Sequence, residues 1–260
     1  MTYLIYPFLG IFAGLLSGLL GVGGGIVVVP VLIITFRLLG FSSDVLTHMA
    51  VGTSLGTILM TSLSSVRHHH LNKAVIWPLV CSMGAGMLLG ALMGAFLADA
   101  LKGRVLQWLF GGFAEIIAFQ MALGLKPKGA RQLPGKGIQV LVGVVVGAIS
   151  AVFGIGGGSL TVPYLTWCNI RIQQAVGTSA ACGWPIALSG AAGFIYTGWN
   201  KTLPAWSVGY IYLPALVGIA VTSIIFAKWG AQYAHKLPEA KLKKIFSAVL
   251  ALVGLKLLFG

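Results

Sequence analysis

Two runs of glycine are the residues of this chain whose type and spacing point most directly to chemistry. Glycines 23–25 and 156–158 each interrupt a long apolar stretch. Each glycine weakens a helix by roughly 1 kcal/mol relative to alanine, so each run predicts a break, with a new helix beginning at Ile26 or at Ser159. The free N–H groups and the positive dipole end of such a helix favour an anion, and glycine leaves the backbone accessible to it.

A second repeated block would add hydroxyl groups to the same region. The sequence AVGTS occurs at residues 50–54 and again, letter for letter, at 175–179. Its threonine and serine can donate neutral hydrogen bonds to an oxyanion, and its glycine permits either a local helix break or close packing. The candidate substrate-binding residues are Gly23, Gly24, Gly25, Gly52, Thr53, Ser54, Gly156, Gly157, Gly158, Ser159, Gly177, Thr178 and Ser179.

Helix packing is the alternative explanation for these glycines. Small residues are common where membrane helices cross, and one such motif taken alone is more often a packing site than a binding site. The occurrence of both motifs in both halves of the chain favours binding. The glycine runs are not nucleotide loops, because no Gly-Lys-Ser/Thr follows them and no strand or downstream acid completes a dinucleotide fingerprint.

Few other side chains suggest chemistry. Glu115 is the only acid well inside an apolar stretch, so it could bind a coupling proton or make a polar contact at a helix or subunit interface. His48 precedes the first AVGTS block and could line a cavity mouth or hydrogen-bond a helix end. Histidines 68–70 are adjacent and flanked by Arg67 and Lys73, which favours a solvated loop over a metal site. We expect no metal site and no cofactor.

These motifs lie in a chain with the composition of an integral membrane protein. Hydrophobic residues make up 58% and charged residues only 8%, against about 25% charged in soluble domains. A membrane-spanning helix needs about 20 apolar residues. Uncharged stretches of at least that length cover residues 1–36, 74–98, 137–170, 172–200 and 202–227. The net charge of +13 comes from short loops with no recognition motif, so nucleic-acid binding is not expected.

The chain is a tandem repeat. Residues 14–30 (GLLSGLLGVGGGIVVVP) and 147–163 (GAISAVFGIGGGSLTVP) are identical at eight of seventeen positions, and the AVGTS blocks follow in the same order. We therefore divide the chain into a first transmembrane repeat (1–125), a basic linker (126–136) and a second transmembrane repeat (137–260). Each repeat should contain a glycine-broken helix pair, either re-entrant or made of two short spans, followed by three transmembrane helices.

The distribution of positive charge predicts how the repeats are oriented. If each glycine-broken pair begins and ends on one side of the membrane, twelve of the 17 lysines and arginines share a side with the linker. These are Arg67, Lys73, Lys126, Lys128, Arg131, Lys136, Arg171, Lys228, Lys236, Lys241, Lys243 and Lys244. Because cytoplasmic loops are enriched in positive charge, the linker should be cytoplasmic. The second repeat would then be inverted relative to the first, as in many secondary transporters.

The paired GxGGG…P and A-x-GTS motifs resemble those of the TauE/SafE-type sulfite exporters, also called the toluene-sulfonate uptake permease family. The resemblance spans both halves: GVGGG at 21–25 with Pro30, GIGGG at 154–158 with Pro163, and the two AVGTS blocks. It implies a multi-pass protein of the bacterial inner membrane that transports small sulfur-containing anions, such as sulfite or organosulfonates like sulfoacetate. It also implies that the glycine and GTS residues form the substrate region.

We therefore expect a secondary transporter that works by alternating access, with the lipid bilayer and a small anion as its partners. A coupling proton or ion and a homodimer are both compatible with the sequence. A non-transporting scaffold or assembly factor and a membrane-embedded enzyme of sulfur metabolism are the alternatives. Enzymes usually group acids, histidines or metal ligands on one face, and this chain shows no such grouping, so we expect no enzymatic activity.

Overall fold

The computed structural model describes residues 5–20, 25–123, 132–234 and 239–259, and these are almost entirely helical. The helices of the first half are α1 (Ile5–Leu20), α2 (Gly25–Leu38), α3 (Leu46–Leu71), α4 (Trp77–Ala100) and α5 (Gly103–Ala122). Those of the second half are α6 (Lys136–Phe153), α7 (Gly158–Trp167), α8 (Ile172–Gly198), α9 (Leu213–Ala234) and α10 (Glu239–Phe259). Between α8 and α9, β1 (Ser207–Val208) and β2 (Ile211–Tyr212) form a short antiparallel hairpin.

Several helices have the length and composition of membrane spans. Among the described residues, α3, α4, α5 and α6 each contain an 18-residue window that is apolar enough to cross a membrane. Shorter apolar helical segments lie at Gly25–Leu38, Leu213–Phe226 and Ser247–Phe259. Large apolar side chains such as Leu89, Met93 and Leu97 of α4 are exposed, as lipid contact requires. The expectation of a helical, multi-pass membrane protein is confirmed.

Glycine ends one helix and starts the next in the second half, as the sequence predicts. Gly154 has a φ of +62°, the left-handed conformation in which glycine commonly ends helices, and α6 stops at Phe153. Residues 155–157 are not helical, and α7 begins at Gly158. In the first half Gly25 is the first residue of α2, while Gly23 and Gly24 lie outside the described residues.

Helices α1 and α9 pack backbone to backbone through two glycines of α1. A Cβ placed on Gly10 would lie 2.7 Å from the carbonyl oxygen of Ile219, and one on Gly14 would lie 2.7 Å from that of Ser223. Side chains at Gly10 and Gly14 would therefore force the two helices apart.

Helices α6 and α4 pack in the same way. A Cβ on Gly143 would lie 2.2 Å from the carbonyl oxygen of Met83, and one on Gly147 would lie 2.5 Å from that of Met87. In the alignment of residues 14–30 with 147–163, Gly14 corresponds to Gly147, and extending the alignment by four residues toward the N-terminus pairs Gly10 with Gly143. The repeated sequence thus makes the same kind of contact twice.

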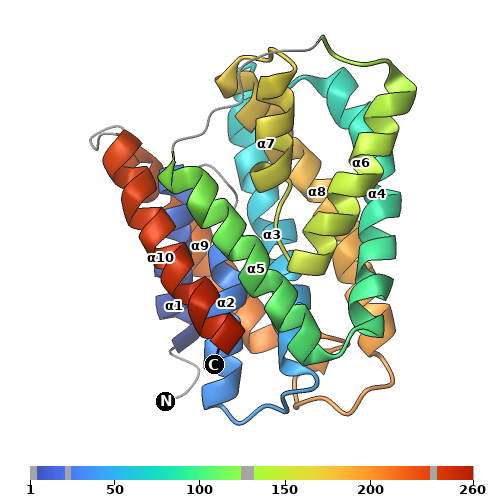
Figure 1. The fold of residues 1–260 in the computed structure, drawn as a ribbon, viewed down its shortest axis with the longest axis vertical. Helices are drawn as coiled ribbons and strands as arrows, with labels where there is room; N and C mark the ends of the chain where they lie inside the picture. The colour runs from blue at the N-terminus through green and yellow to red at the C-terminus, as the bar shows by residue number, and fades with distance from the viewer. Residues whose placement is uncertain (1–4, 21–24, 124–131, 235–238, 260) are drawn as a thin grey trace.

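The two halves of the chain interlock. Helix α4 belongs to the first half but packs on α6 and α8 of the second, and α9 belongs to the second half but packs on α1 and α3 of the first. Figure 1 shows α3 and α8 in the interior, α4 and α6 together on one side, and α5 and α10 paired on the other. Helix α2 ends at the same end of the molecule as α10, whereas α7 ends at the opposite end (Figure 1).

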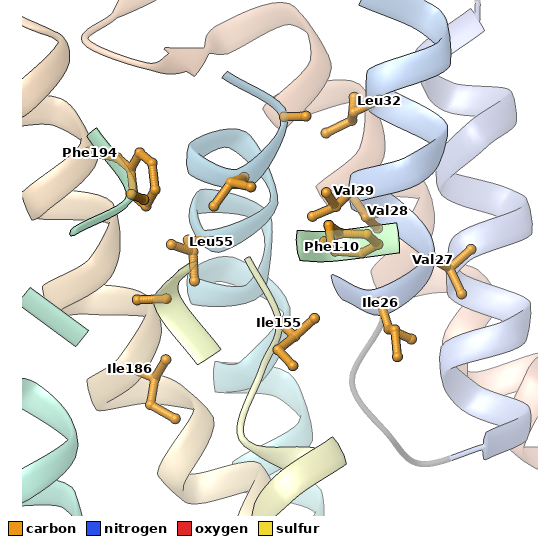
Figure 2. Packing of buried hydrophobic residues seen from close by; sticks show 14 of the residues in the cluster. Ile26, Val27, Val28, Val29, Leu32, Leu55, Phe110, Ile155, Ile186 and Phe194 are labelled. Carbon is orange, nitrogen blue, oxygen red and sulfur yellow. The ribbon is translucent and has the colours of Figure 1, made fainter. Parts of the chain in front are cut away.

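Buried apolar side chains of several helices meet around the α6–α7 loop (Figure 2). Ile26 and Val29 of α2, Leu55 of α3 and Ile186 of α8 are at most 1% exposed. Ile155, which lies in the loop itself, is fully buried among them. The non-helical backbone that follows α6 is therefore enclosed by protein, as irregular backbone inside a membrane must be.

Enlarging a packing glycine of α4 should destabilise the protein. A Cβ on Gly90 would lie 2.0 Å from the carbonyl oxygen of Val144, so Gly90→Leu must separate α4 from α6. Overpacking typically costs about 1–3 kcal/mol, and a backbone clash belongs at the upper end. We expect a lower unfolding temperature in detergent. Gly112→Leu on α5 is the control, because a Cβ there meets no atom within 4 Å; equal unfolding temperatures for the two variants would contradict the packing described.

Candidate functional site

The glycine segments of the two halves touch each other. A Cβ on Gly25, at the start of α2, would lie 2.6 Å from the carbonyl oxygen of Gly154 and 2.8 Å from Cα of Ile155. A Cβ on Gly154 would in turn lie 3.0 Å from Cα of Val51. The loop after α6 thus lies against both the start of α2 and the first AVGTS block.

The start of α7 is an uncapped helix N-terminus. Its N-cap residue is Gly157, which offers no side chain, and no side-chain cap hydrogen bond is present. The carbonyl oxygen of Gly157 accepts the N–H of Thr161 at 2.8 Å, which closes the first turn. The preceding N–H groups of that turn have no acceptor within the helix. They also lie at its positive dipole end, where an anion is stabilised.

Three residues in or beside this N-terminus have buried hydroxyl groups without hydrogen-bond partners. Among the described residues, the hydroxyls of Ser159, Thr161 and Ser179 are buried, and none has a partner. A Cβ on Gly157 would lie 3.3 Å from Oγ1 of Thr161 and 3.4 Å from the carbonyl oxygen of Ser179. A buried unsatisfied polar group costs about 1–3 kcal/mol. A ligand that accepts hydrogen bonds from these hydroxyls would remove that cost.

Ser54 of the first AVGTS block has a structural partner instead. Its hydroxyl donates to the carbonyl oxygen of Gly154 at 2.7 Å, and the side chain is fully buried. The bond joins residues 100 positions apart and holds the α6–α7 loop against α3. Because this donor is already used, Ser54 positions the loop and cannot give the same proton to a ligand.

Thr53 and Thr178 make reciprocal contacts between the halves. Oγ1 of Thr53 accepts the N–H of Tyr212 at 2.9 Å, just before α9, and Oγ1 of Thr178 accepts the N–H of Ile76 at 3.0 Å, just before α4. Each threonine therefore fixes the start of a helix from the other half. Sequence reasoning identified these hydroxyls but not their partners, because the partners are far away in the chain.

The AVGTS glycines serve close packing, which resolves the alternative left open by the sequence. Helices α3 and α8 run without a break through Gly52 and Gly177. A Cβ on Gly52 would lie 3.0 Å from the carbonyl oxygen of Tyr210, and one on Gly177 would lie 2.5 Å from that of Ala74. No second local helix break occurs at either position.

Residues 6–257 match the sequence profile of the family described as "Sulfite exporter TauE/SafE". The chain belongs to the TauE/SafE family. The resemblance seen in the motifs is thereby confirmed over nearly the whole length.

Three relatives of this TauE/SafE chain are each named as a probable membrane transporter protein. One from Haemophilus influenzae is 36% identical over 253 residues, covering 95% of both chains. One from Methanocaldococcus jannaschii is 29% identical over 256 residues, covering 96% of this chain and 92% of its own. One from Bacillus subtilis is 29% identical over 282 residues, covering 100% and 98%. The chain is therefore a probable membrane transporter of the TauE/SafE family.

Other candidate residues of this TauE/SafE member lie away from the start of α7. Glu115 of α5 is in contact with Gly254 of α10, and its buried Oε1 has no partner among the described residues. His48 uses Nε2 to hydrogen-bond the carbonyl oxygens of Ala98 and Leu101, at 3.0 and 3.1 Å. The helix-end contact considered for His48 is confirmed. Histidines 68–70 belong to no cluster of metal ligands in the described part of the chain.

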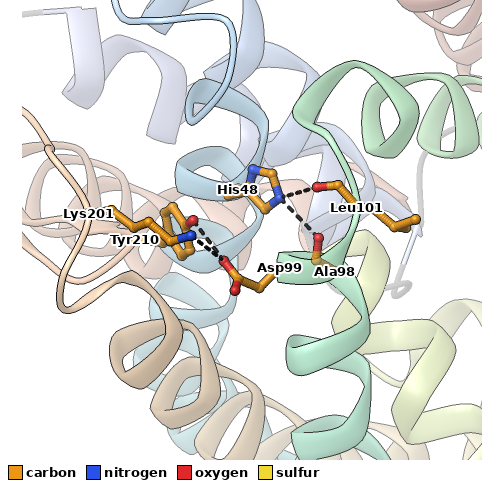
Figure 3. Close-up of polar contacts among 6 residues, drawn as sticks. All are labelled: His48, Ala98, Asp99, Leu101, Lys201 and Tyr210. Atoms are coloured by element: carbon orange, nitrogen blue, oxygen red, sulfur yellow. Dashed lines mark hydrogen bonds and ion pairs between the residues drawn. The ribbon is translucent and has the colours of Figure 1, made fainter.

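A cluster that sequence reasoning missed lies beside His48 (Figure 3). Tyr210, in the β1–β2 turn, donates its hydroxyl to Oδ1 of Asp99 at 2.8 Å, and Nζ of Lys201 lies 3.7 Å from the same oxygen. Burial and the neighbouring Asp99 carboxylate raise the pKa of Tyr210 above its ordinary value, so the phenol stays protonated and donates. These residues come from α4 and the α8–α9 connection, and no motif links them in the sequence.

Proposed function

We propose that this protein is a secondary transporter that carries small sulfur-containing anions, such as sulfite or organosulfonates like sulfoacetate, by alternating access. The observation that carries the proposal is the uncapped start of α7, beside which Ser159, Thr161 and Ser179 keep buried, unpartnered hydroxyls. Membership of a family described by sulfite export and relatives named as transporters support the same conclusion.

Neutral donors suit an anion that must also be released. Every lysine and arginine whose side chain the structure describes is exposed, so none of them supplies a buried positive charge. Amide and hydroxyl donors can replace part of the water around a sulfonate or sulfite oxygen. They hold it less tightly than a buried arginine pair would. Weak binding of this kind favours turnover, because transport requires both entry and exit.

We also propose that the two repeats (1–125 and 137–260) are inverted around this site, with the linker 126–136 on the cytoplasmic side. The matched packing of α1 on α9 and α6 on α4, together with the reciprocal bonds of Thr53 and Thr178, supports a two-fold relation. Helices α2 and α7 end at opposite ends of the molecule (Figure 1). The distribution of lysine and arginine between the loops favours the same arrangement.

In alternating access, the two groups of helices that move against each other would then differ from the two halves of the sequence. One body groups α1, α2, α3 and α9, and the other groups α4, α6, α7 and α8, because these sets pack together. The contact between α3 and α8 joins them. Movement along this contact would open the start of α7 to one side of the membrane and then to the other.

Purified protein in sealed vesicles tests the function directly. We expect labelled sulfite or sulfoacetate to exchange across the membrane, and unlabelled anion to compete. The same anion should stabilise the protein against heat, by about 2.7 kcal/mol at one hundred times its dissociation constant. Sulfate and taurine serve as comparison compounds. Absence of exchange and of stabilisation with every sulfur anion would overturn the proposal and favour a scaffold; chemical conversion of the anion would favour an enzyme.

A further inference from the structure

The end of α4 is tied to α3 and to the β1–β2 hairpin by a group of polar contacts (Figure 3). Nε2 of His48, on α3, lies 3.0 and 3.1 Å from the carbonyl oxygens of Ala98 and Leu101. The hydroxyl of Tyr210 donates to Oδ1 of Asp99 at 2.8 Å. The phenol ring also stacks on the imidazole of His48, with ring centroids 5.1 Å apart and planes at 24°. We call His48, Tyr210 and Asp99 the latch.

The latch joins the two groups of helices that would move against each other in transport. His48 belongs to the group that contains α3, and Asp99 belongs to the group that contains α4. Tyr210 lies between them. Its carbonyl oxygen would lie 3.0 Å from a Cβ on Gly52 of α3, and its N–H donates to the carbonyl oxygen of Phe194 of α8 at 3.1 Å. Separation of α3 from α4 at this end would therefore break the His48 bonds and part of the contacts of Tyr210.

The latch lies on the side of the candidate anion site that the free N–H groups face. Helix α7 begins in the interior and runs toward the end of the molecule opposite to the end of α4 (Figure 1). Since helix N–H groups point toward the N-terminus, those of the first turn of α7 point toward the latch end. His48 and Ser54, which holds the α6–α7 loop, are six residues apart on α3, or about 9 Å along the helix. An anion that leaves the start of α7 toward this end would therefore approach the latch.

The opposite end of the molecule carries different residues at the corresponding positions. In the alignment of the AVGTS blocks, His48 corresponds to Gln173, which is exposed and has no side-chain hydrogen bond to another described residue. The carbonyl oxygen of Ala74 packs on the glycine of the second block as that of Tyr210 packs on the glycine of the first. Alanine has no hydroxyl to donate. In the part of the chain that the structure describes, the histidine and the tyrosine of the latch thus occur at one end only.

We propose that the latch holds the anion site closed at the end of the molecule where α4 ends, and that it opens when the anion passes to that side of the membrane. This inference rests on the proposed transport function and assigns a gating contact to one side. Because Ala74 and Gln173 stand in place of the tyrosine and the histidine at the opposite end, the protein without anion should open more readily toward that end. The latch thereby biases the equilibrium between the two open states.

Thiol labelling from each side of the membrane tests the latch. The reporter is Gly157→Cys, because position 157 is buried at the start of α7. The three native cysteines, Cys81, Cys168 and Cys182, are changed to alanine. A membrane-impermeant thiol reagent is added to sealed vesicles. An epitope inserted in the linker (126–136) identifies the orientation, because α6, which follows the linker, begins at the end opposite to the latch (Figure 1). We expect slow labelling from the latch side.

Removing the tyrosine hydroxyl should change labelling on one side only. Tyr210→Phe keeps the ring and loses the bond to Asp99. We expect labelling from the latch side to become about ten-fold faster or more, and labelling from the other side to stay the same or slow down, because the two open states compete. Asp99→Asn keeps an oxygen that can accept from the tyrosine and should have a smaller effect. Ser82→Ala is the matched control, since it removes a hydrogen bond to Gln139 between α4 and α6, which stay together.

The direction of the change separates gating from loss of structure, which would raise labelling from both sides. The inference is overturned if Tyr210→Phe leaves labelling from the latch side unchanged or raises both sides equally. If Gly157→Cys does not fold, Cys182 is kept as the sole cysteine and serves as the reporter. Cys182 is fully buried on α8, next to Gly183, whose Cβ would lie 3.9 Å from the backbone N of Gly157.

Labelling needs no anion, so the transport function is tested separately. Wild-type protein that exchanges no sulfur anion would overturn the transport function, while one-sided labelling of Tyr210→Phe would still report the latch. Wild-type exchange together with equal labelling of Tyr210→Phe and the unmodified reporter chain would overturn the latch alone.

Discussion

Replacing Gly157 by leucine is expected to abolish anion exchange, by about 100-fold or more, while the protein still folds in the membrane. The backbone at Gly157 has a φ of −56°, so any residue can adopt it. A Cβ there would lie 3.3 Å from Cδ1 of Ile186 and from Oγ1 of Thr161, which is tight but tolerable. If the anion binds the first turn of α7 as proposed, the remaining leucine atoms would compete with it for the same place. A 100-fold loss corresponds to about 2.8 kcal/mol of lost anion stabilisation.

Graded and control variants sharpen this expectation. Gly157→Ala adds only the Cβ and should cost less, about three- to ten-fold, because it displaces the hydroxyl of Thr161 without filling the site. Gly112→Leu introduces the same side chain into open space on α5 and should leave exchange unchanged. Wild-type exchange by Gly157→Leu would refute the assignment of the anion site to the start of α7. Unfolding temperatures measured alongside separate loss of function from loss of fold.

The second large effect is expected for the threonine pair. Thr53→Val and Thr178→Val each keep the side-chain volume but remove the acceptor for a backbone N–H, that of Tyr212 or of Ile76. An unsatisfied buried donor costs about 1–3 kcal/mol, so the double variant should lose about twice the single cost if the two sites act independently. Thermal unfolding in detergent measures this loss.

Serine variants test whether the hydroxyl oxygens of Thr53 and Thr178 stabilise the helix starts. Thr53→Ser and Thr178→Ser keep the acceptor and should retain most of the stability that the valine variants lose. If valine and serine variants unfold at the same temperature, the reciprocal bonds do not stabilise the helix starts. We expect the Thr53 change to be the larger, because the Tyr212 bond is buried while the Ile76 bond is only partly buried.

The sequence predicted the glycine break of the second half well, because three glycines in an apolar stretch have few explanations. Helix α6 ends before Gly154, and α7 begins at Gly158, one residue before the predicted start at Ser159. The AVGTS blocks were harder to interpret. Their glycines look like helix breakers, yet Gly52 and Gly177 stay helical because neighbouring backbone fills the space where a Cβ would be. Such contacts depend on tertiary structure, which local propensity does not report.

The sequence named several residues of the candidate site, and their role in anion binding stays a prediction. Ser159 and Ser179 lie around the start of α7 with unpartnered hydroxyls, whereas Ser54 is committed to Gly154. The role of Ser54 could not be read from the sequence, since it is identical in type and motif to Ser179. Asp99 was also missed, because its partner Tyr210 lies 111 residues away and neither belongs to a motif. The substrate, the inversion of the repeats and the repeat boundaries stay predictions.

The interlocking of α4 and α9 has a consequence for how the protein is made. During synthesis, α4 enters the bilayer before α6 has been made. The two glycines of α4 that pack against α6, Gly86 and Gly90, therefore contact lipid until the second half is synthesised. Helix α1 stays without its packing partner for longer, because α9 is made later still. Neither half is a complete folding unit, so separately produced fragments cut in the linker should be unstable alone and should recover only when they assemble with each other in the same bilayer.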